Sequence, residues 1–265
     1  MAGTTRERAT RALRTHAPEL LEAELVELGQ GLDNAAYAAG DLVLRVAQHG
    51  SVGPEARLLE LVAEHVSIPV PTPRFADEDA GVLAYVRIPG RPLLGRHPPR
   101  GAARRLGSFL RNLHGIDPAT VADVIPTDDA DPDEWLEQLE GPGDLVRAAR
   151  ASRPRASTQR AVAHADLGAE HILERDGTLT GIIDWSDAAV TDPALDFARL
   201  YRDFGPAFLE QVLAAYGPLP GAMPRIEFFA RCAALEDLAF GEATGRLEYF
   251  ANAQRSFTWL FPART

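Results

Sequence analysis

Lysine is absent from this chain of 265 residues, and all 27 basic side chains are arginine. The absence excludes a Walker-A lysine, a Schiff-base lysine and a lysine general base. A single cysteine, Cys232, excludes an internal disulfide and fits a reducing compartment. No apolar run approaches the roughly 18 residues of a membrane span. Residues 1–20 carry four arginines with no apolar segment behind them, so no signal peptide is expected. We therefore expect a cytoplasmic protein without a membrane partner.

The charge balance is acidic, because 38 carboxylates stand against 27 arginines and give a net charge of −11. Nucleic-acid binding needs a basic face, so no nucleic-acid partner is expected. An acidic surface suits a cationic small molecule, although it also serves solubility alone. We expect a monomer that binds a small-molecule acceptor.

The hydrophobic pattern predicts an α+β protein whose character changes near residue 89. Before that point, short apolar stretches separated by glycine turns are typical of antiparallel strands. After it helical patterns dominate, interrupted by a hairpin with a turn at Asp176–Gly177. The break at Pro89–Gly90–Arg91–Pro92 predicts a boundary between two lobes, residues 1–88 and residues 89–265. The expected helices are residues 6–27, 54–65, 102–114, 134–150, 193–202, 206–216 and 225–241, and the expected strands are residues 25–28, 35–38, 42–46, 81–88, 171–173 and 179–183.

Carboxylates and imidazoles gather between His164 and Asp196, around two short apolar stretches. Charged groups beside buried strands are costly unless they bind one another or a ligand. Taken singly, each residue could be a charged loop residue or a helix cap. Asp192, which precedes Pro193, is a candidate N-cap. Their order as a set is more specific.

That order fits the kinase-type catalytic loop H-x-D-x-x-x-x-N. His164 and Asp166 occupy its first two positions, and His171 stands five residues after the aspartate, where a metal ligand is expected. A second metal-binding aspartate should follow one hairpin later, and Asp184 does so. In this chemistry Asp166 accepts the proton of a hydroxyl that attacks a γ-phosphate, and His171 and Asp184 hold Mg²⁺ against the phosphate oxygens. The predicted catalytic residues are Asp166 and His164, with ATP or GTP and Mg²⁺ as cofactors.

The sequence resembles the aminoglycoside phosphotransferase family, and most closely its 2″-phosphotransferases. Three family motifs occur in order: the catalytic loop at residues 164–171, the metal motif GIIDWSDA at residues 181–188, and DPALDF at residues 192–197. The resemblance implies a protein-kinase-like fold, with a small antiparallel-sheet lobe followed by a larger, mostly helical lobe. It also implies structural roles for Asp192 and Asp196, which would tie the catalytic loop to the helix behind it.

His171 departs from the commonest family pattern, in which this position is Asn. The 2″-phosphotransferases and the macrolide phosphotransferases also carry His at this position, so His171 makes the sequence resemble these two groups within the family. Because Mg²⁺ prefers oxygen ligands, His171 is expected to coordinate weakly or through water.

The small lobe resembles the family's nucleotide site. Residues 29–37 resemble its nucleotide-covering loop, so Gly29, Gly31 and Asn34 are expected to contact the nucleotide. A lone G-x-G is also typical of a hairpin turn. A dinucleotide-binding fold is not expected, because Asn34 replaces the third glycine of that motif.

Arg45 stands where kinases carry the phosphate-binding lysine, and a chain without lysine offers no other candidate for that role. Glu55 is expected to orient Arg45, or else it is a carboxylate favoured by the helix dipole. The segment with Tyr85 and Arg87 resembles the family's hinge, and its backbone is expected to bind the purine. The sequence there does not distinguish adenine from guanine.

The expected acceptor site is acidic. Residues 234–241 resemble the helix with which the 2″ enzymes hold ammonium groups, so Glu236 and Asp237 are candidates, with a solvated helix face as the alternative. Glu170 in the catalytic loop and Asp187 after the metal motif complete the predicted acceptor-binding set.

The predicted function is a Mg²⁺-dependent O-phosphotransferase acting on a small cationic antibiotic, an aminoglycoside first, which would confer resistance. One alternative keeps the fold and chemistry but takes a macrolide, a basic peptide antibiotic or a small metabolite. A second is a catalytically silent nucleotide-binding module, and a third is a metal-dependent hydrolase using His164, His171 and Asp184.

Overall fold

The computed structural model describes residues 3–30, 34–137 and 139–262. Contacts along the chain divide it into two compact units. Unit 1 comprises residues 1–64 and 69–88, and unit 2 comprises residues 65–68 and 89–265. The combination of an antiparallel sheet and a mostly helical unit confirms the predicted α+β class. Among the described helices, none has both the length and the apolar character that crossing a membrane requires.

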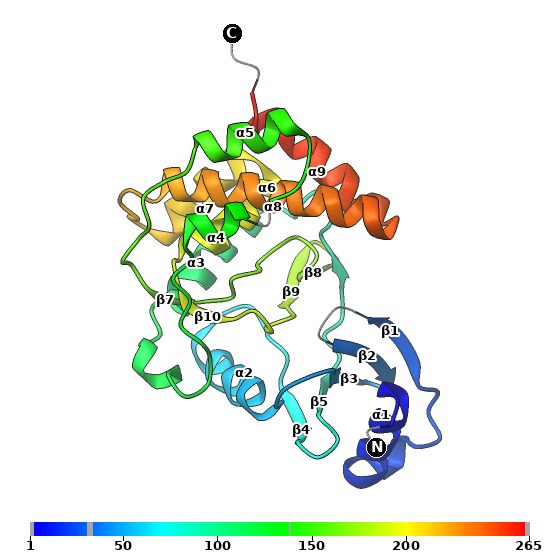
Figure 1. Cartoon of the computed structure of the whole chain (residues 1–265). Helices are drawn as coiled ribbons and strands as arrows, with labels where there is room; N and C mark the ends of the chain where they lie inside the picture. The colour runs from blue at the N-terminus through cyan, green and yellow to red at the C-terminus, as the bar shows by residue number, and fades with distance from the viewer. Residues whose placement is uncertain (1–2, 31–33, 138, 263–265) are drawn as a thin grey trace. The chain divides into compact units, whose positions relative to one another are not determined.

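Unit 1 is built on a five-stranded antiparallel sheet in the order β1-β2-β3-β5-β4 (Figure 1). Helix α1 packs against this sheet through Ala9, Ala12 and Leu13, which share a core with Leu44 and Val82. The central strand β3 is buried along its whole length, which places Arg45 in the interior of the unit. The elements are α1 (Thr5–His16), η1 (Pro18–Leu20), β1 (Val26–Gln30), β2 (Asn34–Ala39), β3 (Leu42–Ala47), α2 (Gly53–His65), β4 (Pro73–Asp77) and β5 (Val82–Val86).

Two expectations for this unit were wrong. The predicted helix over residues 6–27 ends at His16, because Pro18 disfavours a helical conformation at Ala17, whose φ is −148°. Strand β4, which begins at Pro73 on the edge of the sheet, was not among the expected strands. Proline is tolerated there because an edge strand has N–H groups that need no ladder partner.

Unit 2 combines two small sheets with a helical body (Figure 1). Strands β7 and β10 form an antiparallel pair, and β6, β8 and β9 form a three-stranded sheet. Helices α6, α8 and α9 pack on one another, and α3 packs on α7. The elements are β6 (Arg91–Pro92), α3 (Ala102–His114), η2 (Pro118–Val121), α4 (Pro132–Glu137), α5 (Gly143–Ala151), β7 (Ala161–Ala163), β8 (Ile172–Arg175), β9 (Thr178–Ile182), β10 (Ala189–Thr191), α6 (Ala194–Phe204), α7 (Pro206–Tyr216), α8 (Met223–Thr244) and α9 (Leu247–Leu260).

The helical body also differs from expectation in two places. The single helix predicted over residues 134–150 is two helices, because Gly141, with φ +142°, and Pro142 interrupt the pattern between α4 and α5. Helix α9 was not predicted at all, although it contributes buried Asn252, Ser256 and Leu260 to the packing against α8.

Candidate active site

The predicted catalytic loop begins where β7 ends. Strand β7 is short and fully buried, and it pairs with β10 through the register Ala163↔Ala189. The loop leaves the strand at His164 and turns sharply at Ala165, whose φ of +65° lies in the left-handed region. A non-glycine residue there costs about 1 kcal/mol or more, so surrounding contacts must hold it.

Asp196, in the first turn of α6, supplies those contacts. Its two carboxylate oxygens accept hydrogen bonds from the backbone N–H of Ala165 at 2.8 Å and of His164 at 3.2 Å. The Nε2 atom of His114 lies 2.9 Å from Asp196 Oδ2, and His114 Nδ1 lies 3.2 Å from the hydroxyl of Tyr216. Asp196 is fully buried, so the loop is anchored to the helical body from inside.

His164 is fully buried, and both of its ring nitrogens are engaged. Nε2 lies 3.1 Å from the carbonyl oxygen of Ile183 and therefore donates, while Nδ1 accepts from the backbone N–H of Asp166 at 3.3 Å. Burial lowers the pKa of His164, and its ring packs against Trp185 with centroids 4.7 Å apart. His164 is thus a neutral imidazole in a single tautomer that joins the loop to the end of β9.

The β8–β9 hairpin brings His171 and Asp184 together. Its turn residues Asp176 and Gly177 have φ values of +53° and +76°, which is typical of the tight turns that fix hairpin register. The predicted strands and turn are confirmed here. The backbone N–H of Ile183 donates to the carbonyl of His171 at 3.0 Å, so Asp184 emerges beside the imidazole.

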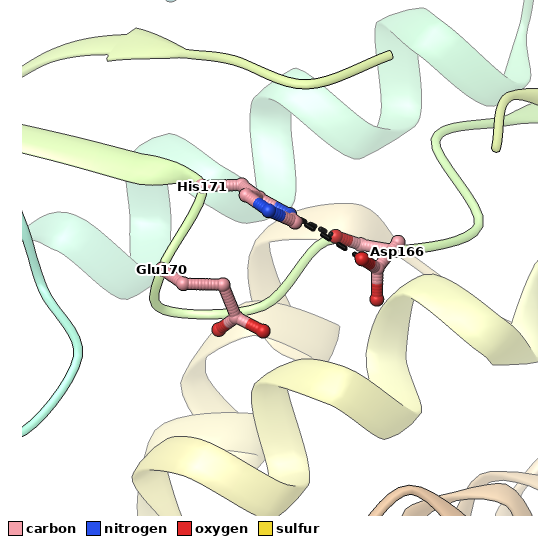
Figure 2. Close-up of side chains that lie close together, drawn as sticks. All are labelled: Asp166, Glu170 and His171. Carbon is pink, nitrogen blue, oxygen red and sulfur yellow. Dashed lines mark hydrogen bonds and ion pairs between the residues drawn. The ribbon is translucent and has the colours of Figure 1, made fainter. Parts of the chain in front are cut away.

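The carboxylate of Asp166 lies between an arginine and the imidazole. Arg199 Nε is 3.1 Å from Oδ1. His171 Nδ1 is 3.5 Å from Oδ2 and 2.8 Å from the Asp166 carbonyl oxygen (Figure 2). Burial alone would raise the pKa of Asp166, but the charges of Arg199, His171 and Arg202 outweigh it and hold this pKa well below its usual range. Asp166 is therefore ionised throughout the neutral range.

The donor set around His171 fits a divalent cation. Because Nδ1 donates to the backbone, Nε2 is the ring atom left for a ligand, and it lies 3.6 Å from Asp184 Oδ2. Burial opposes the charged imidazolium, yet Glu170, Asp166 and Asp184 raise the pKa of His171, which shows an excess of negative charge at this point. The ligand atoms of Asp166, Glu170 and His171 also lie within 4.8 Å of one another.

Asp187 belongs to the same acidic group. Partial burial raises the pKa of Asp187, and the negative charges of Asp166 and Asp184 raise it further. Ser186 donates to Asp184 Oδ1 at 2.8 Å, and Asp184 has a φ of +63°. A carboxylate held in a strained backbone conformation is frequent at functional sites.

Two arginines of α6, neither of which was predicted as a site residue, join this loop to helix α8. In the outer bridge, Arg199 lies between Asp166 and Glu236, with Nη1 3.4 Å from Glu236 Oε2. In the inner bridge, Arg202 Nη2 lies 3.2 Å from Glu170 and Nη1 lies 3.2 Å from Asp237. No local motif indicates these pairs, because each carboxylate is more than 30 residues from its arginine in the sequence.

The inner bridge is buried. Arg202 has no exposed surface, and its guanidinium also contacts both carboxylate oxygens of Asp203, at 2.6 and 3.0 Å. Burial disfavours the charged guanidinium, but Asp203, Asp237 and Glu170 together raise the pKa of Arg202, so it stays ionised. Asp203 in turn accepts from the backbone N–H of Ala169 at 2.6 Å, which anchors the loop at a second point.

The four predicted acceptor residues divide into two environments. Asp187 and Glu236 are exposed, whereas Glu170 and Asp237 are largely covered and already bonded to Arg202. Asp192 is buried too: it accepts from the backbone N–H of Ala194 at 3.0 Å and pairs with Arg225 at 2.5 Å.

The predicted nucleotide residues lie in unit 1, except that Gly31 lies outside the described residues. Arg45 of β3 forms an ion pair with Glu55 of α2, as expected for the orienting carboxylate. Gly29 is in β1, Asn34 begins β2 and Tyr85 is in β5 opposite Val43.

The backbone N–H of Arg87 donates to the carbonyl of Asp41 at 2.8 Å. This hydrogen bond lies inside unit 1, and the expected contact of the Arg87 backbone with a purine stays a prediction.

Comparison with known proteins places this arrangement among phosphotransferases. The model of the phosphotransferase enzyme family matches residues 24–229. Viomycin phosphotransferase from Streptomyces vinaceus is 29% identical over 196 residues, which cover 64% of this chain and 67% of that protein. Two solved structures share the fold: APH(2″) in complex with GDP and kanamycin, with a TM-score of 0.75 and 21% identity over 93% of this chain and 96% of that one, and macrolide 2′-phosphotransferase from Brachybacterium faecium, with a TM-score of 0.68 and 24% identity over 98% of each chain.

The fold and the family match together define a kinase of small molecules. The chain belongs to the phosphotransferase enzyme family, and the resemblance to the aminoglycoside phosphotransferases is confirmed. The family match ends at residue 229, before the carboxylates of α8 that enter the two bridges.

Proposed function

We propose that the protein is a Mg²⁺-dependent O-phosphotransferase that moves the γ-phosphate of ATP or GTP to a hydroxyl of a small cationic antibiotic, an aminoglycoside first. The observation that supports this most is the position of Asp166. Its ionised carboxylate is held by Arg199 on one oxygen and faces His171 with the other, beside Asp184 at the open end of the hairpin. This is the arrangement that positions a hydroxyl for attack on a phosphoryl group.

In the proposed reaction the acceptor oxygen forms a bond to the γ-phosphorus, and the bond from that phosphorus to the β,γ-bridging oxygen breaks. The acceptor hydroxyl proton passes to Asp166, and the nucleoside diphosphate leaves. Asp184 and His171 would hold Mg²⁺, which supplies positive charge to the phosphate oxygens. The low pKa of Asp166 keeps its carboxylate ionised at neutral pH, so it can accept a hydrogen bond from the acceptor hydroxyl and orient that hydroxyl for attack.

His164 is better assigned to positioning than to proton transfer. It is neutral, fully buried and bonded at both ring nitrogens, so it cannot reach an acceptor without breaking those contacts. Asp196 acts on the same loop through its N–H groups, and Asp192 fixes the start of α6 through Arg225. All three are proposed as positioning residues.

Residues 1–88 are proposed as the nucleotide-binding lobe and residues 89–265 as the catalytic and acceptor-binding lobe. Arg45 would contact the phosphates and Glu55 would orient it. The support is their ion pair within the buried part of unit 1. Two further parts of the nucleotide site stay predictions: the glycine-containing segment with Gly29, Gly31 and Asn34, and the hinge around Tyr85.

A cationic acceptor is proposed because the carboxylates nearest Asp166 outnumber their arginine partners. Asp187 and Glu236 are exposed and would meet the acceptor directly, while Glu170 and Asp237 would act from behind through Arg202. Viomycin and kanamycin appear in the names of similar proteins. Phosphorylation adds almost two negative charges, which would oppose binding of a cationic antibiotic to an anionic target and so give resistance.

The decisive experiment measures nucleoside diphosphate release from ATP and from GTP, with Mg²⁺, across aminoglycosides, viomycin, macrolides and amino alcohols. Turnover with one acceptor class that is lost in Asp166→Ala would support the proposal. The matched control is Asp176→Asn, which removes a negative charge from the exposed hairpin turn and keeps a residue that tolerates positive φ. Acceptor-dependent release that is limited to macrolides or metabolites would favour the alternative acceptors.

A silent nucleotide-binding module is the candidate from another class. It predicts saturable nucleotide binding and no acceptor-dependent release with either nucleotide. The ionised, accessible Asp166 speaks against it, because such a module has no use for a carboxylate held in this way.

A further inference from the structure

The outer and inner bridges each join a carboxylate of the catalytic loop to one of α8 through an arginine of α6, but they differ in exposure. Arg202 of the inner bridge is completely buried, whereas Arg199 is 15% exposed and Glu236 is 49% exposed. A guanidinium–carboxylate contact of 3.4 Å at such an exposed carboxylate is weak and screened by solvent. The Arg199–Glu236 contact is therefore the exchangeable part of the two bridges.

Arg199 has two other anchors. Its Nε atom lies 3.1 Å from Asp166 Oδ1, and its guanidinium carbon lies 5.9 Å from the ring centre of Trp135 on α4. A cation over the face of an indole ring is attracted to it. These anchors do not involve Glu236, so Glu236 can change partner while Arg199 stays on Asp166.

We propose that Arg199 is both a positioning and a specificity-determining residue of this enzyme: it fixes the Asp166 carboxylate and masks Glu236 until a cationic group of the acceptor takes that carboxylate. The inference rests on the proposed phosphotransfer to a cationic acceptor. In this inference, the guanidinium of Arg199 is a cation of the protein itself that competes with the acceptor for Glu236. An acceptor without a positive charge near its reacting hydroxyl gains no binding free energy from Glu236. An acceptor with such a charge gains only the difference between its own contact with Glu236 and that of Arg199.

The two roles of Arg199 have opposite consequences when the side chain is removed. In Arg199→Ala, Glu236 is unmasked, so a cationic acceptor should bind more tightly, by about fivefold if the lost competition is near the upper range for an exposed ion pair. Asp166 loses the contact that orients it, so kcat should fall by about tenfold or more. A merely structural defect would weaken acceptor binding as well as turnover.

The test is calorimetric binding of kanamycin and of viomycin without nucleotide, together with kcat and KM for whichever acceptor turns over. Arg199→Ala should lower the acceptor Kd and the kcat together. In Glu236→Gln the acceptor should bind more weakly, and adding Arg199→Ala to that variant should no longer tighten binding. Arg199→Lys keeps the charge but not the two-ended contact, so its kcat should lie between those of wild type and Arg199→Ala.

Arg104→Ala is the charge-matched control, because Arg104 lies on an exposed position of α3 beside α7. It should leave Kd and kcat unchanged. Equal or weaker acceptor binding in Arg199→Ala, or tightening that persists in the Glu236→Gln background, would overturn this inference and leave the proposed function standing. If wild type binds neither antibiotic, the proposed acceptor class fails, and the inference that depends on it fails with it.

Discussion

The carboxylate of Asp196 accepts a hydrogen bond of 2.8 Å from the backbone N–H of Ala165, a residue held at φ +65° one position before Asp166. The helix that follows the hairpin thus fixes the turn that aims the proposed base. Because Asp196 also accepts from His164 and contacts His114, one buried carboxylate serves three donors. Asp196 therefore holds the loop in its turned conformation from the helical body.

Asp196→Asn should therefore reduce both stability and turnover. The amide keeps one acceptor oxygen but turns an NH₂ group toward a backbone N–H donor, which leaves a buried donor unsatisfied. We expect a loss of about 3 kcal/mol in the free energy of unfolding and a kcat lower by about 100-fold. Urea unfolding and steady-state rates measure the two effects. The control Asp176→Asn, in the exposed turn, should change neither the free energy of unfolding nor kcat. An Asp196→Asn variant that matched wild type would show that the loop keeps its conformation without the Asp196 carboxylate.

The conformation of Ala165 gives a second prediction. Glycine enters the left-handed region without steric cost but loses about 0.5–1 kcal/mol through unfolded-state entropy. Ala165→Gly should therefore lie within about 1 kcal/mol of wild type. Ala165→Val should lose at least about 2 kcal/mol, because a β-branched side chain is strained there. Thermal unfolding with a folding check by circular dichroism separates the two. Equal stabilities for the two variants would contradict the strained turn.

Much of the fold was readable from local pattern. The hairpin around Asp176–Gly177 was predicted correctly because a two-residue turn with positive φ favours these residues and fixes its strands. Helix α9 was missed because no cap or apolar period was identified after Gly245, and its burial comes from packing on α8. The first helix was extended too far because its apolar spacing continued past Pro18, although the backbone before a proline disfavours that continuation.

The candidate site was predictable where its residues are close in sequence. Residues 164–171 and Asp184 follow a short motif, and the hairpin register brings its members together. Arg199 and Arg202 could not be found in this way, because their carboxylate partners come from the catalytic loop and from α8. The one available signal was a pair of arginines three positions apart on α6, facing the acidic pairs 166/170 and 236/237.

His171 gives a prediction about the metal. Asn offers an amide oxygen, which Mg²⁺ accepts more readily than imidazole, whereas Ala offers no ligand. His171→Asn should retain Mg²⁺-dependent turnover, and His171→Ala should need an Mg²⁺ concentration at least about tenfold higher for half-maximal rate. Both variants lose the contact of Nδ1 to the Asp166 carbonyl, so their comparison isolates the ligand. A Mg²⁺ dependence in His171→Ala identical to that of wild type would show that His171 does not bind the metal.

Asp237 links the site to pH through stability. Burial raises the pKa of this carboxyl to about 7, with Glu170 and Asp203 adding to the shift and Arg202 opposing it. Its Oδ2 atom has no hydrogen-bond partner among the described residues. From about pH 4 to pH 7 the unfolded chain ionises at this residue while the folded chain keeps the proton, so its contribution to stability falls as pH rises and is fully unfavourable above pH 7.

Asp237→Asn removes this titration from both states. Relative to wild type, the free energy of unfolding of the variant should improve by about 3 kcal/mol between pH 5 and pH 8.5, as measured by urea unfolding at both values. Glu236→Gln is the matched control on the next residue: its carboxylate is exposed, so no comparable pH-dependent gain is expected. A difference between Asp237→Asn and wild type that stays constant across this range would mean that Asp237 is ionised in the folded protein, and that Arg202 outweighs the cost of burying its charge.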